Sequence, residues 1–131
     1  MTDPSRSRHV LVVEDNVDVG DAFRVLFEST GRRVSVVRTV AEAIAAARAD
    51  PVDLMLLDLT LPDGSGLEIL EELRDTPSRP RVSVALTGRD EPAIARRCQD
   101  LGCAAVLVKP VPARELLRRA DAWLSPGADA S

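Results

Sequence analysis

The sequence predicts a doubly wound α/β fold, in which a parallel sheet carries helices on both faces. Short apolar runs alternate with longer segments whose apolar residues recur every three or four positions, and buried strands alternating with amphipathic helices have this pattern. Five such pairs follow one another. Strands that alternate with helices form parallel sheets with right-handed crossovers. The ligand site of such a sheet lies beyond the carboxyl ends of its strands, where the strand order reverses.

The third apolar run is the one best suited to the centre of this sheet. Residues 54–57 are apolar throughout, and Asp58 follows them directly. A strand that is buried on both faces has this composition. The other runs are similarly short and rich in valine and leucine. The sequence therefore predicts strands at residues 9–13, 33–37, 54–58, 82–86 and 104–108.

Each strand leads into a segment with the period of an amphipathic helix. Gly31 is expected to end the first helix and Gly102 the fourth, since glycine is common just beyond a helix. Thr39 and Glu42 have the spacing of a capping box that opens the second helix. The last helix is expected at residues 113–124. The apolar faces comprise Val19, Ala22, Phe23, Leu26 and Thr30; Val40, Ala43, Ile44 and Ala47; Leu67, Leu70 and Leu73; Ile94, Cys98 and Leu101; and Leu116, Leu117, Ala120 and Leu124.

Composition excludes several classes of protein. The 131 residues, 45% apolar and 29% charged, are typical of one globular domain. A net charge of −4 disfavours nucleic acid as a partner, because such binding needs a basic face. No apolar run approaches the roughly 18 residues of a membrane span, and the polar start has no signal-peptide core. We therefore expect a cytoplasmic protein with a disordered arm at residues 1–8, one domain at 9–124 and a flexible tail at 125–131.

The two cysteines and the single histidine are expected to be structural. Cys98 and Cys103 are too few for a disulfide framework and have the wrong spacing for a metal or redox pair, so they are interpreted as small core residues. His9 excludes a multi-histidine zinc site, since it is the only histidine. It also enters the first strand at the end opposite the polar residues described next.

Unusual polar residues stand at the carboxyl ends of the predicted strands. Glu14 and Asp15 follow the first strand, Asp58 the third, Thr87 the fourth and Lys109 the fifth. Because the carboxyl ends of parallel strands share one edge, we expect these side chains to converge. Taken singly, the acidic pair could open a helix, Thr87 could cap one, and Lys109 could be a solvated charge. Their common placement favours a site.

Three carboxylates at close quarters repel one another and therefore need a cation. With only oxygen ligands nearby, Mg²⁺ is the natural choice. Lys109 adds a positive charge, and Thr87 adds a hydroxyl donor. Together these groups form a pocket for a small doubly charged anion that is attached to, or attacked by, Asp58, since carboxylates can act as nucleophiles toward phosphorus. The metal and Lys109 would neutralise the transferring phosphoryl oxygens.

Four short motifs carry these residues. They read Leu-Val-Val-Glu-Asp-Asn at 11–16, Leu-Asp-Leu-Thr-Leu-Pro at 57–62, Leu-Thr-Gly at 86–88 and Val-Lys-Pro at 108–110. In order and spacing they resemble the signatures of two-component response regulator receiver domains, either single-domain or part of a hybrid histidine kinase. The resemblance covers about residues 10–124. It implies a flavodoxin-like (βα)5 sheet of strand order 2-1-3-4-5 and a cis bond before Pro110.

The resemblance also implies roles for the site residues. Asp58 would accept a phosphoryl group from a histidine kinase or histidine phosphotransfer protein, and phosphorylation would change binding to a downstream protein. The implied magnesium ligands are Glu14, Asp15, Asp58 and, through its backbone carbonyl, Thr60. Thr87 and Lys109 would grip the phosphoryl oxygens. The protein would assist its own phosphorylation and dephosphorylation but would not turn over an external substrate.

One departure from the family pattern bears on the switch. Receiver domains usually carry Tyr or Phe three residues before the lysine, and this position is Val106 here. Valine cannot rotate inward as that ring does, so we expect the switch to use Thr87 and the loop that ends at Asp90, or another residue of the last helices. Thr60 and Arg89 occupy the two variable positions that tune dephosphorylation in the family, and Arg89 could shield the phosphoryl group or pair with it.

Three other functions fit parts of the sequence. A receiver-like interaction module without phosphate control is disfavoured by the intact site and slightly favoured by Val106. A magnesium-dependent aspartyl phosphatase would need a second acid two residues after Asp58, where Thr60 stands. A flavin carrier would need a hydroxyl-rich phosphate loop, whereas Glu14 and Asp15 would repel phosphate, and the chain has few aromatic residues.

Overall fold

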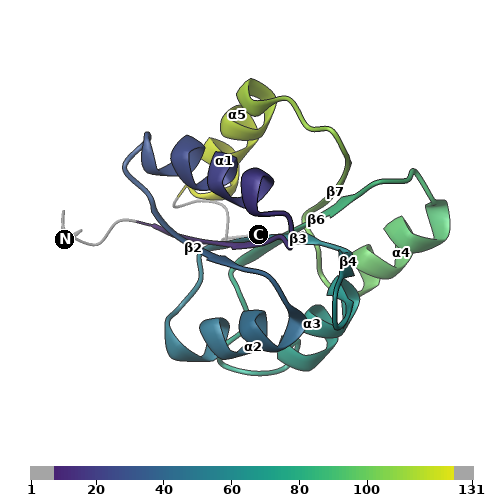
Figure 1. Cartoon of the computed structure of the whole chain (residues 1–131). Helices are drawn as coiled ribbons and strands as arrows, with labels where there is room; N and C mark the ends of the chain where they lie inside the picture. The colour runs from purple at the N-terminus through teal and green to yellow at the C-terminus, as the bar shows by residue number, and fades with distance from the viewer. Residues whose placement is uncertain (1–7, 126–131) are drawn as a thin grey trace.

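The computed structural model describes residues 8–125, which form one parallel sheet between two layers of helices (Figure 1). The sheet has five strands in the order β2-β1-β3-β6-β7. They are β1 (His9–Val13), β2 (Arg33–Val37), β3 (Leu54–Asp58), β6 (Val82–Thr87) and β7 (Ala105–Val108). Since β6 and β7 are the fourth and fifth strands of this sheet along the chain, the predicted order 2-1-3-4-5 is confirmed.

One layer of helices covers each face of the sheet (Figure 1). The first layer consists of α1 (Val17–Glu28) and α5 (Ala113–Trp123), and the second of α2 (Val40–Ala49), α3 (Gly66–Leu73) and α4 (Pro92–Asp100). Each helix follows a strand of the sheet, as the alternating pattern of the sequence predicts. The doubly wound (βα)5 fold is therefore confirmed.

The side chains of alternate β3 residues pack into two separate hydrophobic cores. Met55 and Leu57 pack with residues of α2, α3 and α4, whereas Leu54 and Leu56 pack with residues of α1 and α5. All four side chains are fully buried, and the alternation follows the two-residue period of a strand. The apolar run therefore holds both helical layers, as expected for a strand buried on both faces.

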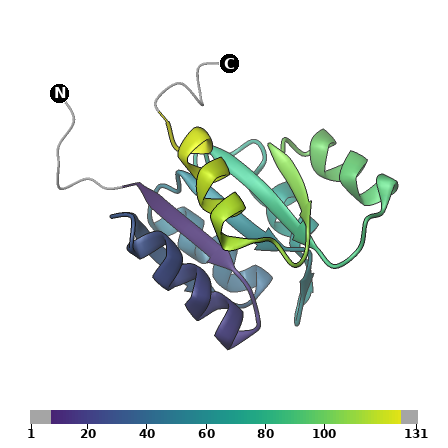
Figure 2. The same cartoon turned by 90° about the horizontal axis from the view of Figure 1, so that it is seen from above.

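The strand registers bring the carboxyl ends of the strands to one edge. Val13 pairs with Leu57, Asp58 with Leu86, and Thr87 with Val108. The loop after β1 and the small hairpin after β3 lie at this same end of the sheet (Figure 2). Side chains that follow β1, β3, β6 and β7 are consequently neighbours in space.

A short antiparallel hairpin follows β3, in a stretch for which the sequence predicts neither a strand nor a helix. Its strands are β4 (Thr60–Leu61) and β5 (Gly64–Ser65). Strands of two residues are too short to show an alternating pattern, so the sequence gives no sign of them. The hairpin leads directly from the end of β3 to the start of α3.

The helix caps differ in part from those predicted. Thr39 Oγ1 accepts a hydrogen bond from the Glu42 amide at 3.0 Å, but the Glu42 carboxylate accepts from the Arg38 amide at 2.8 Å. The capping box predicted at Thr39 and Glu42 is therefore only half formed. The complete capping box lies at α3, between Ser65 and Glu68.

The two cysteines meet at the end of α4. The Cys103 amide donates to the Cys98 carbonyl and the Gly102 amide to the Gln99 carbonyl, both at 2.9 Å, which is the Schellman pattern of helix termination. Cys98 is fully buried, and Cys103 is partly exposed. Burial and the neighbouring Cys98 thiol raise the pKa of Cys103 to about 12. Burial also raises the pKa of Cys98. Both thiols therefore stay protonated at neutral pH and act as small apolar groups.

His9 lies at the amino end of β1, opposite the edge that carries the acids. Its Nδ1 is 2.9 Å from the Pro51 carbonyl, its Nε2 is 2.8 Å from Ser35 Oγ, and the residue is only 2% exposed. Buried polar groups need partners of this kind. A structural role for His9 is the one that we expected.

The predicted arm and tail fall largely outside the described residues, because residues 1–7 and 126–131 are not described. Of the arm only Arg8 is included, and its carbonyl accepts from the Arg33 amide at 2.9 Å. Within residues 8–125, no helix combines the length and the apolar composition needed to cross a membrane.

Candidate functional site

Three carboxylates gather where β1 and β3 end. One oxygen from each of Glu14, Asp15 and Asp58 lies within 4.8 Å of the others. Glu14 is 2% exposed and Asp58 is 8% exposed, whereas Asp15 faces the solvent. Buried carboxylates are costly unless they are paired and hydrogen-bonded. The stability of the site therefore depends on the charges and hydrogen-bond donors around Glu14 and Asp58.

Lys109 supplies the positive charge. Its Nζ donates to Glu14 Oε1 at 2.8 Å and to Asp58 Oδ2 at 2.7 Å. Burial acts to lower the pKa of Lys109, but its hydrogen bonds to the two carboxylates and their charges outweigh burial and raise that pKa. Lys109 is thus an ammonium at neutral pH. The bond between Lys109 and Pro110 is cis, as expected from the resemblance.

Backbone amides complete the hydrogen bonding of the buried acids. The Thr60 amide donates to Asp58 Oδ1 at 2.9 Å, and the Asn16 amide donates to Glu14 Oε2 at 3.1 Å. Together with the bonds from Lys109, they give each carboxylate oxygen of Glu14 and Asp58 a hydrogen-bond partner. Asn16 also caps α1, because its Oδ1 accepts from the Val19 amide at 3.0 Å. Asparagine before a helix is a recognisable N-cap signal, but no role was predicted for Asn16.

The donor set suits a magnesium ion. All the side-chain ligands in the cluster of Glu14, Asp15 and Asp58 are carboxylate oxygens, and Mg²⁺ prefers oxygen ligands. Three carboxylates face a single ammonium, so the site has an excess of negative charge that a divalent cation would neutralise. The residues present therefore fit the metal that their chemistry predicts.

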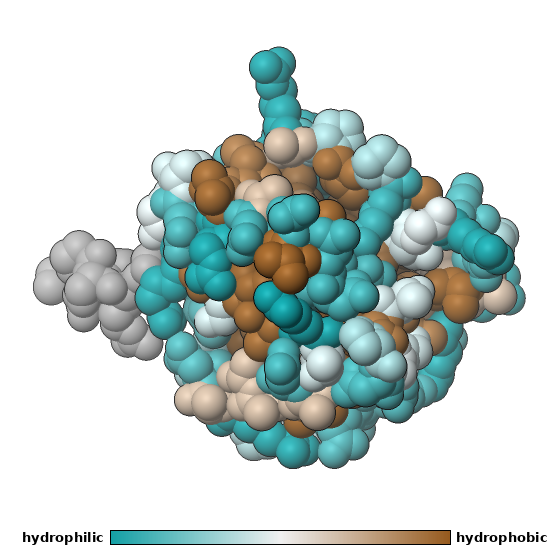
Figure 3. All heavy atoms as spheres, viewed as in Figure 1, coloured by the Kyte–Doolittle hydropathy of each residue, from teal (hydrophilic) through white to brown (hydrophobic). Residues whose placement is uncertain are grey.

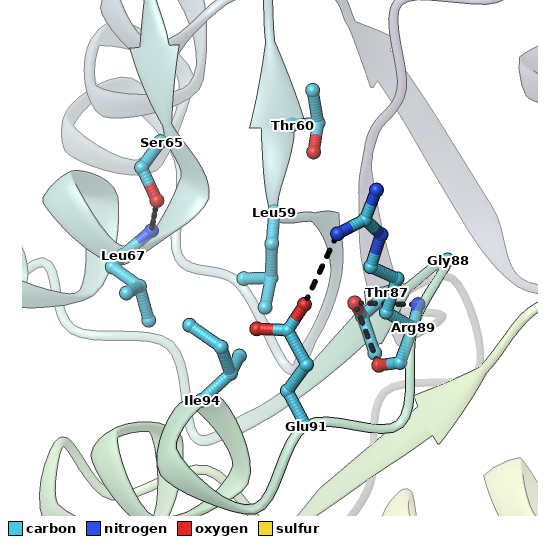
Figure 4. Close-up of a pocket in the computed structure, with 9 residues that line it drawn as sticks. All are labelled: Leu59, Thr60, Ser65, Leu67, Thr87, Gly88, Arg89, Glu91 and Ile94. Atoms are coloured by element: carbon cyan, nitrogen blue, oxygen red, sulfur yellow. Dashed lines mark hydrogen bonds and ion pairs between the residues drawn. The ribbon is translucent and has the colours of Figure 1, made fainter.

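Thr87 lies at the same edge, but its hydroxyl bonds the backbone of Arg89 and not the acids. Thr87 Oγ1 donates to the Arg89 carbonyl and accepts from the Arg89 amide, both at 3.2 Å (Figure 4). These bonds are at the long limit for hydrogen bonds. The structure therefore brings Glu14, Asp15, Asp58 and Lys109 together, and it leaves the Thr87 hydroxyl bonded within its own loop.

A groove of about 470 Å³ opens beside Thr87 (Figure 4). Leu59, Leu67 and Ile94 form its apolar part. The side chain of Arg89, which is 84% exposed, forms an ion pair with Glu91 at 3.7 Å. Val106 does not line this groove and instead packs, partly buried, against the core shared by α2, α3 and α4.

Gly66, the first residue of α3, packs against the backbone of the site. A Cβ at this position would collide with the Asp58 carbonyl and press on the Leu59 Cα at 3.1 Å. Only glycine therefore allows α3 to begin this close to β3.

We expect Gly66→Ala to lower the free energy of unfolding by about 1–3 kcal/mol, because overpacked sites must shift their backbone. Chemical denaturation would measure the loss. Gly88→Ala is the matched control, since a Cβ at Gly88 meets nothing within 4 Å. Equal free energies of unfolding for the two variants would show that α3 shifts to make room for the Cβ without loss of stability.

These features agree with the match of residues 10–121 to the model of the response regulator receiver domain. The chain belongs to this family. Receiver domains are phosphorylation-based signalling switches, and the resemblance drawn from the four motifs is thereby confirmed.

Curated relatives of this receiver domain include proteins of different lengths. The sensory transduction protein RegX3 of Mycolicibacterium smegmatis is 36% identical over 120 residues, which is 92% of this chain and 52% of RegX3. The polar-differentiation response regulator DivK of Brucella ovis is 32% identical over 124 residues, which is 90% of this chain and 97% of DivK. The chain therefore spans about half of RegX3 and nearly all of DivK.

Solved receiver domains have the same fold. One from Methanospirillum hungatei, described as CheY-like, gives a TM-score of 0.85 at 28% identity and covers 91% of this chain and 94% of its own. The receiver domain of the sensor histidine kinase PA1611 from Pseudomonas aeruginosa gives 0.80 at 28% identity and covers 91% and 98%. That second protein holds a magnesium ion in its active-site cleft.

Proposed function

We propose that this receiver domain accepts a phosphoryl group on Asp58 and thereby changes its binding to a partner protein. The observation that carries the proposal is the hydrogen-bonded arrangement around Asp58. Lys109 Nζ lies 2.7 Å from one carboxylate oxygen of Asp58, and the carboxylates of Glu14 and Asp15 lie beside it. A nearly buried acid surrounded by a cation and two further acids suits a metal-assisted nucleophile.

The proposed step is a phosphoryl transfer. An Asp58 oxygen forms a bond to phosphorus while the P–N bond of a phosphohistidine donor breaks, and the imidazole keeps the electron pair and takes up a proton. The residues that would hold Mg²⁺ are Glu14, Asp15, Asp58 and the backbone carbonyl of Thr60. The metal would neutralise charge on the phosphoryl oxygens, and Lys109 would hold another of them.

Thr87 would link phosphorylation to a change of shape. Its hydroxyl would leave Arg89 and donate to a phosphoryl oxygen, which would draw residues 87–90 toward Asp58. The long 3.2 Å bonds to Arg89 support this, because they are easily exchanged for a stronger bond to a charged oxygen. With Val106 in place of an aromatic ring, this loop is the proposed route of the signal.

The proposed phosphodonor is a histidine kinase or a histidine phosphotransfer protein. A cavity of about 380 Å³ beside Lys109 is lined mostly by apolar residues of α1 and of the segment after β7, including Phe23 and Val111. Such a surface suits the apolar part of a donor helix. On the face seen in Figure 3, hydrophobic surface is interrupted by hydrophilic residues. The downstream partner is a protein, and a cytoplasmic location is part of this proposal.

Acetyl phosphate with Mg²⁺ tests the proposal. We expect the intact mass of the chain to increase by one phosphoryl group, and we expect a chelator of divalent cations to prevent the increase. A chain that stays unmodified under conditions that phosphorylate another receiver domain would instead favour an interaction module that does not depend on phosphate.

Arg89 is proposed to slow the loss of the phosphoryl group, because its guanidinium can reach over the groove beside Thr87 (Figure 4). We expect Arg89→Ala to speed dephosphorylation by about two- to five-fold, as fits the loss of one exposed charge interaction. The decay of the phosphorylated mass with time would measure this rate. Arg74→Ala, which removes an exposed arginine after α3, is the control. An unchanged rate in Arg89→Ala would contradict the proposed role.

A further inference from the structure

Asp63, at the tip of the β4–β5 hairpin, is bound to a distant helix. Its Oδ1 accepts from the Val40 amide at 2.7 Å and its Oδ2 from the Ala41 amide at 3.1 Å. These amides belong to the first turn of α2, 23 and 22 residues away in sequence. The bond from Val40 is the main reason that the pKa of Asp63 lies below its ordinary value.

The start of α2 does not depend on Asp63 alone. Thr39 Oγ1 accepts from the Glu42 amide at 3.0 Å, and the Glu42 carboxylate accepts from the Arg38 amide at 2.8 Å. The helix therefore has local caps from its own residues. What Asp63 adds is a hydrogen-bonded connection between this helix and the hairpin.

Through that connection, hydrogen bonds link the backbone segments on both sides of the acidic site. The Glu14 amide donates to the Val37 carbonyl at 2.9 Å, at the end of β2 just before α2. At the other end of the hairpin, the Thr60 amide donates to Asp58 Oδ1 at 2.9 Å. The hairpin that carries Thr60 is thus tied, through Asp63, to the same junction that holds the backbone of Glu14.

The far side of the hairpin is fixed in a different way. The Ser65 amide donates to Glu68 at 2.7 Å, and the Gly66 amide donates to the Leu59 carbonyl at 3.1 Å. These bonds hold the hairpin to α3. Without Asp63, the hairpin would keep its hydrogen bonds to α3 but lose those to α2, so its tip could tilt away from the acids.

We propose that Asp63 is a positioning residue for the phosphoacceptor site, which keeps the Thr60 carbonyl in register with the carboxylates of Glu14, Asp15 and Asp58. The inference rests on the proposed function, in which this carbonyl is a magnesium ligand. Asp63 itself touches neither metal nor phosphoryl group. Its effect is on how tightly the site binds the cation.

Mg²⁺ binding to the full chain, followed by NMR titration of its amide signals, tests this inference. Loss of a group that directly orients a metal ligand typically weakens metal affinity by about 10–100-fold. Asp63 orients the Thr60 carbonyl only indirectly, through the hairpin. We therefore expect Asp63→Ala to raise the Kd for Mg²⁺ by a smaller factor, about three- to ten-fold. Asp63→Asn keeps one acceptor oxygen and should fall between Asp63→Ala and the wild type. Asp75→Ala, which removes an exposed carboxylate from the loop after α3, is the matched control and should bind like the wild type.

A second readout separates positioning from helix capping. We expect phosphorylation of Asp63→Ala by acetyl phosphate to need more Mg²⁺ for half its maximal rate, while the rate at saturating Mg²⁺ stays within about two-fold of the wild type. A changed signal for the Val40 and Ala41 amides with an unchanged Kd would mean that Asp63 only caps α2, and would overturn the inference. If the wild type binds Mg²⁺ but is never phosphorylated, the proposed function fails, and the Kd values still decide the role of Asp63.

Discussion

Asp58→Asn is expected to abolish phosphorylation of the chain by acetyl phosphate. Asparagine has nearly the shape of aspartate and can still accept from the Thr60 amide, which lies 2.9 Å from Asp58 Oδ1. It has no carboxylate oxygen to attack phosphorus, however, and its amide is a poor nucleophile. The intact mass of the variant should therefore stay constant under conditions that add one phosphoryl group to the wild type.

The matched control for this loss is Asp75→Asn, which makes the same chemical change on the exposed loop after α3. It should be phosphorylated like the wild type. Persistent modification of Asp58→Asn would show that another group accepts the phosphoryl, and fragmentation of the modified chain would locate it. The exposed Asp15 is the acid to inspect first, because one of its oxygens lies within 4.8 Å of Asp58.

The sequence predicted the acidic site because topology alone creates it. Once Leu54 to Leu57 is assigned to a central parallel strand, the residues after neighbouring strands must share an edge. Glu14, Asp58 and Lys109 then converge without any knowledge of side-chain conformations. Their hydrogen bonds of 2.7 and 2.8 Å follow from this placement and from the opposite charges.

Features that depend on side-chain direction or on long-range bonds could not be predicted. Thr87 stands at the expected strand end, but whether its hydroxyl bonds Arg89 or faces Asp58 depends on the loop conformation. Asp63 occupies a Pro-Asp-Gly turn, where aspartate is common for local reasons. Nothing in that pattern indicates a bond to the Val40 amide across 23 residues.

Lys109→Ala is expected to have the second largest effect, and it should change both stability and rate. Without the ammonium, the buried Glu14 and Asp58 each lose a hydrogen bond and face each other's charge. Leaving buried acceptors unpaired costs about 1–3 kcal/mol, so the free energy of unfolding without Mg²⁺ should fall by about this amount. Phosphorylation by acetyl phosphate should slow by about 10²–10³-fold, as when one stabilising donor of a transition state is removed.

Two comparisons separate the charge of Lys109 from its position. Added Mg²⁺ should restore part of the lost stability of Lys109→Ala, because a cation bound only by the folded chain stabilises it. Lys109→Arg keeps the charge but presents a larger, planar head, so it should be nearly as stable as the wild type and still be phosphorylated slowly. If Lys109→Ala were phosphorylated within about two-fold of the wild-type rate, the proposed contact between Lys109 and the phosphoryl group would be wrong.

The wild type offers a direct view of the same group, because Lys109 is the only lysine in the sequence. Lysine labelled with ¹⁵N therefore gives a single side-chain ammonium signal. That ammonium bonds Glu14 and Asp58 in this structure, and a phosphoryl oxygen on Asp58 would offer it a third, more strongly charged acceptor. We expect the signal to move when Mg²⁺ binds and again when Asp58 is phosphorylated. If the chemical shift of this signal did not change on phosphorylation, the proposed contact between Lys109 and the phosphoryl group would be contradicted, since Lys109 Nζ lies 2.7 Å from an Asp58 carboxylate oxygen.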